Sequence, residues 1–153
     1  MSGKKKRKQS NPQPGKSFGG PKVSAMIIEM GGDYIGSGKT LKDRQNAMSH
    51  VAFAWNLALL TKEKREMKFL LIKNLYMNSN TAMTEVDFQH LKTVLEKLVS
   101  RKLKLFPDIR RVIFNAELHV IDGKEHITVL STEEEVLKAS RRQPDPSLLG
   151  LKL

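Results

Sequence analysis

The chain has 153 residues, no cysteine and a formal net charge of +11, because 27 lysines and arginines outnumber 16 aspartates and glutamates. This length predicts one domain, and the absence of cysteine excludes disulfides, thiolate metal sites and a thiol nucleophile. No uninterrupted apolar run approaches the roughly 18 residues of a membrane span, and no apolar segment follows the basic N-terminus, so we expect neither a membrane partner nor a secretory signal.

The N-terminal segment, residues 1–21, is rich in glycine, proline and lysine, and its only aromatic residue is Phe18. Such a segment cannot bury enough apolar surface to offset the entropy lost on ordering. We therefore predict a disordered basic tail over residues 1–21, a single α+β domain over 22–140 and a loose C-terminal tail over 141–153. The tail contains five consecutive cations: Lys4, Lys5, Lys6, Arg7 and Lys8.

The first predicted element of the domain is a strand over residues 23–30, because this short run is dominated by apolar residues. Gly31, Gly32 and Asp33 are expected to end the strand, and residues 36–38 to extend the break into a loop.

Three helices are predicted after this loop. Each follows a threonine that can act as an N-cap, namely Thr40, Thr61 and Thr84. An aspartate three residues after Thr40 and after Thr84 completes the pattern of a capping box. Apolar residues then recur at spacings of three and four, the period of one buried helical face. The helices are expected over residues 41–60, 62–77 and 85–104.

From residue 112 to residue 121 the apolar pattern changes to a period of two, which is typical of a strand with one buried face. The dipeptide Asp122-Gly123 favours a type I′ turn, so residues 124–131 are predicted to return as the partner strand of a hairpin. A two-residue loop places Leu118 opposite Ile127, and both strands then agree on which face is buried.

The same register places Ala116 opposite Val129. A last short helix is predicted to start at Thr132. The expected architecture is a three-helix layer against a small sheet that contains the C-terminal antiparallel hairpin, in the order strand, three helices, two strands and helix.

Residues 36–40, with the sequence GSGKT, resemble the end of a phosphate-binding loop, in which glycine amides and a lysine contact phosphate oxygens. The pattern also needs a glycine five residues before Gly38, but that position is Asp33, whose charge would repel a polyphosphate. Two interpretations follow: a loop with weak anion or nucleotide affinity, or a plain connector that ends in a helix cap. The candidate phosphate ligands are Gly36, Gly38, Lys39 and Thr40.

The predicted register also places His119 opposite His126 on the exposed face of the hairpin, with Glu117 opposite Thr128 beside them. Two imidazoles and a carboxylate could bind a divalent metal, but a metal site needs three or four ligands of fixed geometry. The competing interpretation is a solvated polar face, and we expect no metal and no cofactor.

A second basic cluster follows the third predicted helix. Cations at a helix C-terminus are also expected from the helix dipole alone, so this cluster only suggests a contact surface. Its members are Lys97, Arg101, Lys102, Lys104, Arg110 and Arg111.

Together these features indicate a non-enzymatic, nucleic-acid-associated protein that contacts phosphates, with RNA favoured over DNA. Residues 4–8 would serve as an electrostatic arm, and Lys102, Lys104, Arg110 and Arg111 as a second contact. We expect a cytoplasmic location, or a nuclear one in a eukaryotic host. The alternatives are a nucleotide-binding protein that uses residues 36–40, and an interaction module that docks a protein partner on Asn115, Glu117 and His119.

Overall fold

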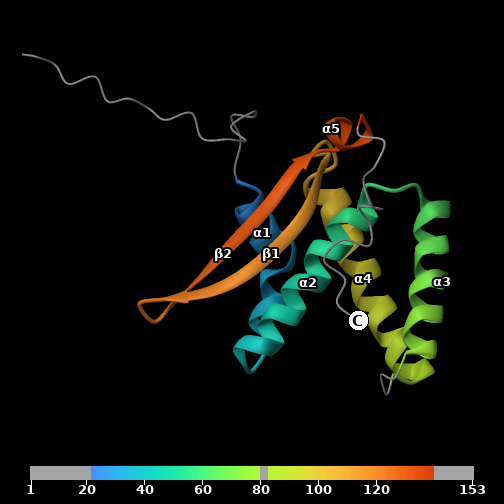
Figure 1. Ribbon diagram of the computed structural model, residues 1–153, viewed down its shortest axis with the longest axis horizontal. Coiled ribbons are helices and arrows are strands. Elements are labelled where there is room, and N and C mark those ends of the chain that lie inside the picture. The colour runs from blue at the N-terminus through green and yellow to red at the C-terminus, as the bar shows by residue number, and fades with distance from the viewer. Residues whose placement is uncertain (1–21, 80–82, 140–153) are drawn as a thin grey trace, which may run out of the picture.

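The computed structural model describes residues 22–79 and 83–139, so the two predicted tails, 1–21 and 141–153, lie outside the described residues. The described chain forms four helices, an antiparallel hairpin and one short helix, which confirms the predicted α+β class (Figure 1). The elements are α1 (Val23–Gly36), α2 (Leu41–Ala58), α3 (Lys62–Asn78), α4 (Glu85–Leu105), β1 (Arg111–Ile121), β2 (Lys124–Glu133) and α5 (Glu134–Lys138).

The predicted strand over residues 23–30 is wrong, because residues 23–36 form helix α1. Gly31 and Gly32, which were expected to end the element, lie inside this helix. A Cβ atom on Gly31 would lie 2.6 Å from Cγ2 of Val51 in α2, so the glycine allows the two helices to approach closely. The buried residues recur at helical spacings of three and four. They are Val23, Met26, Ile27, Met30, Gly31 and Ile35.

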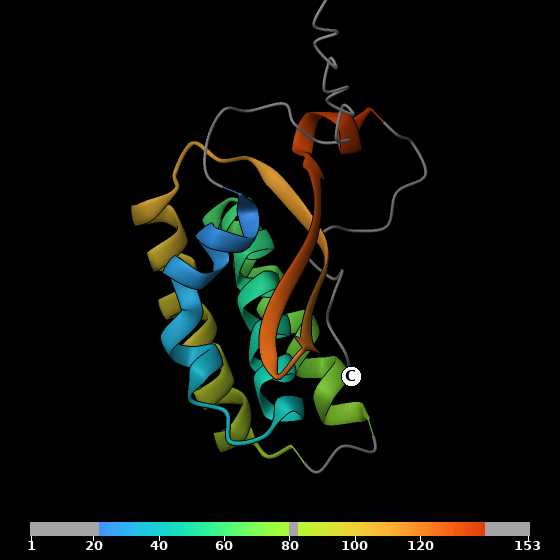
Figure 2. The ribbon, with the colours of Figure 1, turned by 90° about the vertical axis from the view of Figure 1, so that its left-hand side faces the viewer.

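Helix α2 is the centre of the fold, and α1, α4 and β1 all pack against it (Figure 2). Residues 51–58 are buried without interruption, which a helix tolerates only when neighbours surround it. The predicted capping boxes at Thr40 and Thr84 are both present, and Thr61 caps α3 by accepting a hydrogen bond from the Lys64 amide. In the described part of the chain, no helix combines the length and apolar character that crossing a bilayer requires.

Helix α3 lies at the side of the molecule away from the hairpin (Figure 1). Its buried residues, Phe69, Ile72 and Tyr76, belong to the hydrophobic core. Its opposite face exposes large apolar side chains to solvent. These are Met67, Leu70, Leu71, Leu75 and Met77.

The predicted hairpin is confirmed, including its register: Leu118 pairs with Ile127 and Ala116 with Val129. Asp122 and Gly123 have φ angles of 51° and 75°, the positive values that a type I′ turn requires. An irregularity in the pairing between Ile113 and Asn115 changes the register toward the start of β1. Strand β2 continues to Glu133, so α5 begins at Glu134 and the helix start predicted at Thr132 is wrong.

Side chains of α2 satisfy the outer edge of β1. The Gln45 amide donates to the Ala116 carbonyl at 2.9 Å and accepts from the Leu118 amide at 2.7 Å. The Asn56 side chain makes the same two bonds with the backbone of Ile113, both at 2.9 Å. Each amide thus replaces a neighbouring strand, so the hairpin is joined to α2 by hydrogen bonds as well as by apolar contact.

Candidate nucleic-acid interface

The structure describes only one of the two predicted contact regions. Residues 4–8 lie outside the described residues. The second contact is described: Lys102 and Lys104 lie in the last turn of α4, and Arg110 and Arg111 lie where the chain enters β1. These four cations are close in sequence, but their environments differ.

Lys102 is buried, with 1% of its surface exposed. Its Nζ donates to the carbonyls of Phe106 at 2.7 Å and Ile109 at 2.6 Å, and lies 4.8 Å from the centroid of the Trp55 ring. Burial, helped by the nearby Arg110 charge, lowers the pKa of Lys102 to about 8. Its ammonium therefore holds the connection between α4 and β1 in place and is not available to a phosphate.

Helical spacing contained the signal that Lys102 would be buried. The buried residues of α4 recur at intervals of three and four, and position 102 continues that series. A lysine at the end of an apolar stripe can bury its alkyl stem, and here its ammonium finds two carbonyl acceptors. The buried residues are Phe88, Leu91, Leu95, Leu98, Val99 and Lys102.

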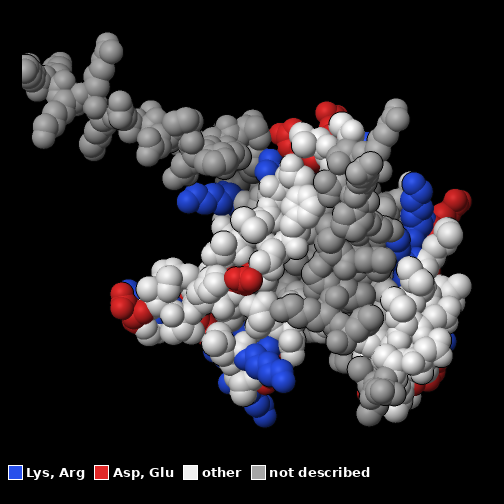
Figure 3. All heavy atoms as spheres, viewed as in Figure 1, with Lys and Arg blue, Asp and Glu red and all other residues white. Residues whose placement is uncertain are grey.

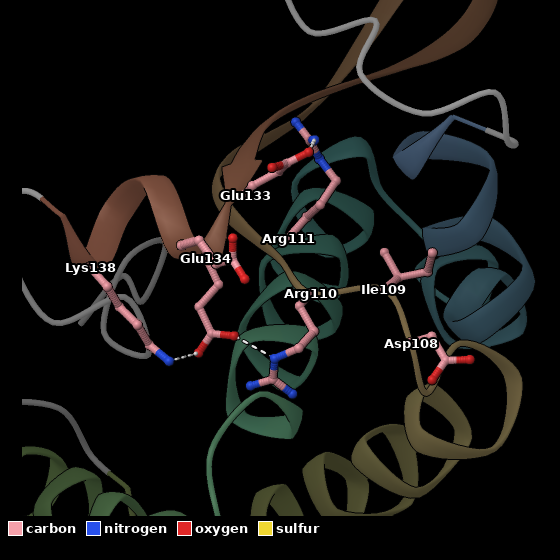
Figure 4. A pocket seen from close by; sticks show the side chains of 8 residues that line it. Asp108, Ile109, Arg110, Arg111, Glu133, Glu134 and Lys138 are labelled. Carbon is pink, nitrogen blue, oxygen red and sulfur yellow. Dashed lines mark hydrogen bonds and ion pairs between the residues drawn. The ribbon is translucent and has the colours of Figure 1, made fainter.

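Arg110 and Arg111 bind to parts of the fold. Arg111 is 8% exposed, and its guanidinium donates to the side-chain oxygen and the carbonyl of Ser131 at 3.0 and 3.1 Å. Arg110 donates to Glu134 at 2.6 Å and to the Leu59 carbonyl at 3.0 Å. In Figure 4, Arg110 and Lys138 both point at the Glu134 carboxylate, which also accepts from Lys138 at 3.2 Å.

The same residues line an open depression of about 410 Å³ between the start of β1 and α5. The carboxylates around it outnumber the cations, so it does not favour a polyphosphate. Three of the four acids come from the end of β2 and from α5, which only the folded chain brings beside the arginines. The charged lining residues are Asp108, Glu133, Glu134, Glu135, Arg110, Arg111 and Lys138.

Of the predicted second contact, Lys104 is the cation that stays exposed without an ion pair to any described residue. It shares one face of α4 with Lys97 and Arg101, at helical spacings of three and four. Arg101 pairs with both Asp33 oxygens, at 2.7 and 3.0 Å, and these hydrogen bonds lower the pKa of Asp33. The exposed basic surface of α4 therefore reduces to Lys97 and Lys104.

The loop over residues 36–40 connects α1 to α2 and does not follow a strand. The Ser37 and Gly38 amides donate to carbonyls of the last turn of α1, and the Thr40 amide donates to the Asp43 carboxylate. The Thr40 hydroxyl accepts from the Asp43 amide as a helix cap. A Cβ atom on Gly38 would lie 2.8 Å from the Arg44 amide nitrogen, so close packing explains this glycine. This geometry supports the connector interpretation, and phosphate binding here stays a prediction.

The hairpin places His119 opposite His126, as predicted. Glu117 lies 3.2 Å from Nε2 of His119 and accepts from Asn115 at 2.9 Å. All four side chains are exposed. No cluster of three or more His, Asp or Glu residues able to hold a metal occurs within residues 22–79 and 83–139.

Sequence reasoning missed one half-buried titratable pair, between α1 and α2. The Tyr34 hydroxyl lies 2.9 Å from Nδ1 of His50, and the two rings stack with their centroids 6.1 Å apart. Burial lowers the pKa of His50 and raises the pKa of Tyr34, so both groups are held neutral at pH 7. The pair links the two helices. Among the described residues, no carboxylate forms a hydrogen bond with the side chain of Tyr34 or His50.

No protein-family model matches the chain, no curated protein matches it significantly, and no solved structure matches it.

Proposed function

We propose that this protein is a non-enzymatic, nucleic-acid-associated protein that contacts RNA phosphates through the cations of residues 4–8. The observation that carries the proposal is the distribution of charge. Residues 22–79 and 83–139 contain 18 bases and 15 acids, a net charge of +3, whereas residues 1–21 contain six bases and no acid. A run of like charges of this density binds polyanions because it releases their condensed counterions.

Residues 22–79 and 83–139 contribute less, since their 15 acids offset most of their positive charge and seven of their 18 cations form ion pairs. On the face shown in Figure 3, cations lie in separate groups, and carboxylates lie beside several of them. Lys97 and Lys104 on α4 are the exposed pair that supports a second contact. The ion-paired cations are Arg44, Lys73, Lys92, Arg101, Arg110, Arg111 and Lys138.

The test measures the affinity for duplex RNA as a function of salt, for the full chain and for a variant that lacks residues 2–8. Five lost phosphate contacts should reduce the slope of log affinity against log salt by about 4 to 5. A control variant that permutes residues 2–8 and keeps all five charges should bind like the full chain, because phosphate contact does not depend on their order. An unchanged slope in the deletion variant would refute the proposal.

A second pair of variants tests the contribution of α4. Lys97→Gln combined with Lys104→Gln should reduce the slope by up to about 2 if both residues meet phosphates. Lys62→Gln combined with Lys64→Gln, at the exposed start of α3, is the matched control and should leave the slope unchanged. Equal effects of the two pairs would mean that α4 has no special role.

Nucleotide binding at residues 36–40 is an alternative that the geometry of the loop supports less. It predicts that millimolar nucleotide with Mg²⁺ raises the melting temperature and that Lys39→Ala abolishes the rise. The loop amides already bind carbonyl and carboxylate oxygens of the protein. We therefore expect no rise in the melting temperature of the wild type or of Lys39→Ala.

A protein partner that docks on the outer face of the hairpin is the second candidate, and the exposure of Asn115, Glu117 and His119 on that face is the observation that favours it.

A further inference from the structure

The outer face of α3 is apolar although it faces solvent. Met67, Leu71 and Leu75 recur at a spacing of four and form one stripe along the helix, and Leu70 and Met77 widen it. The exposed fractions of these five side chains run from 37% for Leu75 to 71% for Met67. A contiguous apolar surface of this kind marks an interaction site, because covering it removes apolar area from water.

Helix α3 uses its other sides to bind the rest of the fold. Its buried residues belong to the hydrophobic core, and Lys73 pairs with Glu85 at the start of α4 at 2.8 Å. Successive residues of a helix are about 100° apart around its axis, so Leu71 and Leu75 lie on the side opposite Lys73. The contacts that hold α3 in the fold therefore leave its outer face accessible.

The described chain ends beside the start of α3. Leu137 of α5 packs with Leu59 and Val112 in a small apolar cluster, and Leu59 lies two positions before Thr61, the N-cap of α3. Figure 1 shows α3 beginning at the same end of the molecule as α5 and running away from it. A segment that continues from residue 139 therefore starts at the N-terminal end of the outer face of α3.

Residues 140–153, which follow the described chain, have a composition that fits this face. The first eight are polar residues and prolines, and the last six contain four leucines. The nine residues from 139 to 148 span at most about 30 Å. Leu75 lies only about 21 Å along α3 from its N-cap, at 1.5 Å per residue. The whole stripe is thus within reach of the leucines, which are Leu148, Leu149, Leu151 and Leu153.

We propose that residues 148–153 bind the outer face of α3 in the same chain, with their leucines covering Met67, Leu71 and Leu75. Apolar contact must carry this binding, because α3 has five cations and two acids, and residues 140–153 have three cations and one acid. A second copy or another protein would have to reach the same face from solution. The attached segment is instead present at an effective concentration on the order of millimolar, so it occupies the face first.

The test uses the absence of cysteine from the chain, which allows a pair of introduced thiols to report the contact. Asn74→Cys lies on the exposed side of α3, and Gly150→Cys lies among the leucines. The control pair combines Gly150→Cys with Glu29→Cys, an exposed position of α1, on the opposite side of the molecule from α3 (Figures 1 and 2). In the full chain with oxidised glutathione, the first pair should form an intramolecular disulfide about tenfold faster than the control pair. Intact mass and non-reducing gels separate intramolecular from intermolecular products.

Substitutions added to the Asn74→Cys, Gly150→Cys chain test what holds the segment in place. Leu149→Ser with Leu151→Ser should slow disulfide formation to the rate of the control pair, because the apolar contact is lost. Arg141→Gln with Arg142→Gln is the matched control, with two substitutions in the same segment outside the leucine run, and it should leave the rate unchanged. Raising the salt to about 0.5 M should not slow the reaction, because no ion pair is involved.

Three results would overturn the proposal: equal rates for the two cysteine pairs, a rate that the two serine substitutions do not change, or a product that is mainly an intermolecular dimer. The last result would mean that the outer face of α3 binds a second copy.

A measurement without thiols is the fluorescence of anilinonaphthalene sulfonate, a dye that binds exposed apolar surface. Leu149→Ser with Leu151→Ser should bind more dye than the wild type, and equal binding would also contradict the proposal. Neither assay uses nucleic acid or residues 4–8, so a failure here leaves the proposed RNA contact standing.

Discussion

Replacing Asn56 by alanine should destabilise the fold strongly. Asn56 is 2% exposed, and its side chain forms two hydrogen bonds with the backbone of Ile113, which is 1% exposed. Alanine would leave the Ile113 amide and carbonyl without these partners in a region that water does not reach. Each buried polar group that loses its partner costs about 1 to 3 kcal/mol, so we expect the free energy of unfolding to fall by about 3 kcal/mol.

Gln45→Ala is the matched control, because Gln45 makes the same two bonds to Ala116 and Leu118. Gln45 is only half-buried, so water can replace its amide. We expect a loss below about 1 kcal/mol. Urea unfolding followed by circular dichroism measures both losses. If Asn56→Ala costs no more than Gln45→Ala, burial does not set the value of these bonds and the reasoning is refuted.

Three further predictions concern packing and titration. Gly31→Val should lower the free energy of unfolding by about 1 to 3 kcal/mol, because the new side chain overlaps Val51, whereas Gly32→Ala should be neutral or stabilising in the same urea titration. From pH 8 to 9.5 the free energy of unfolding should rise by about 1.5 kcal/mol, because the pKa of Lys102 is about 8 in the folded chain against an ordinary value of 10.5. The unfolded chain therefore keeps the Lys102 proton to a higher pH than the folded chain does. A flat profile in the wild type, or an equal rise in Lys102→Met, would contradict this. As pH falls below 6.5 stability should decrease, because burial lowers the pKa of His50 and the unfolded chain binds the proton first; His50→Phe should remove this decrease in melts between pH 5 and 7.

Local chemistry was readable from the sequence wherever a few neighbouring residues decide the structure. The hydroxyls of Thr40, Thr61 and Thr84 reach amides three residues away, so these helix starts depend on nothing distant. Asp122 and Gly123 fix a two-residue turn, and that turn sets which residues of the two strands face each other from the turn as far as Asn115. The α+β class and the hairpin register followed from these local rules.

Helix α1 shows where local reading fails. An apolar run interrupted by two glycines is typical of a strand followed by a loop, yet Gly31 lies in a helix because Val51 of α2 packs directly against it. The conformational cost of glycine in a helix is offset by a close contact between two helices, and no window of neighbouring residues contains that contact.

The candidate interface shows the same division. Composition alone established the excess of positive charge and its concentration in residues 1–21. Only the tertiary structure decided which cations of the body remain at the surface: it buries Lys102 against Trp55, and it brings Glu134 onto Arg110 from 24 positions along the chain. Charge in a sequence is a property of each residue, whereas the field that a partner meets depends on which opposite charges and carbonyls the fold places beside it.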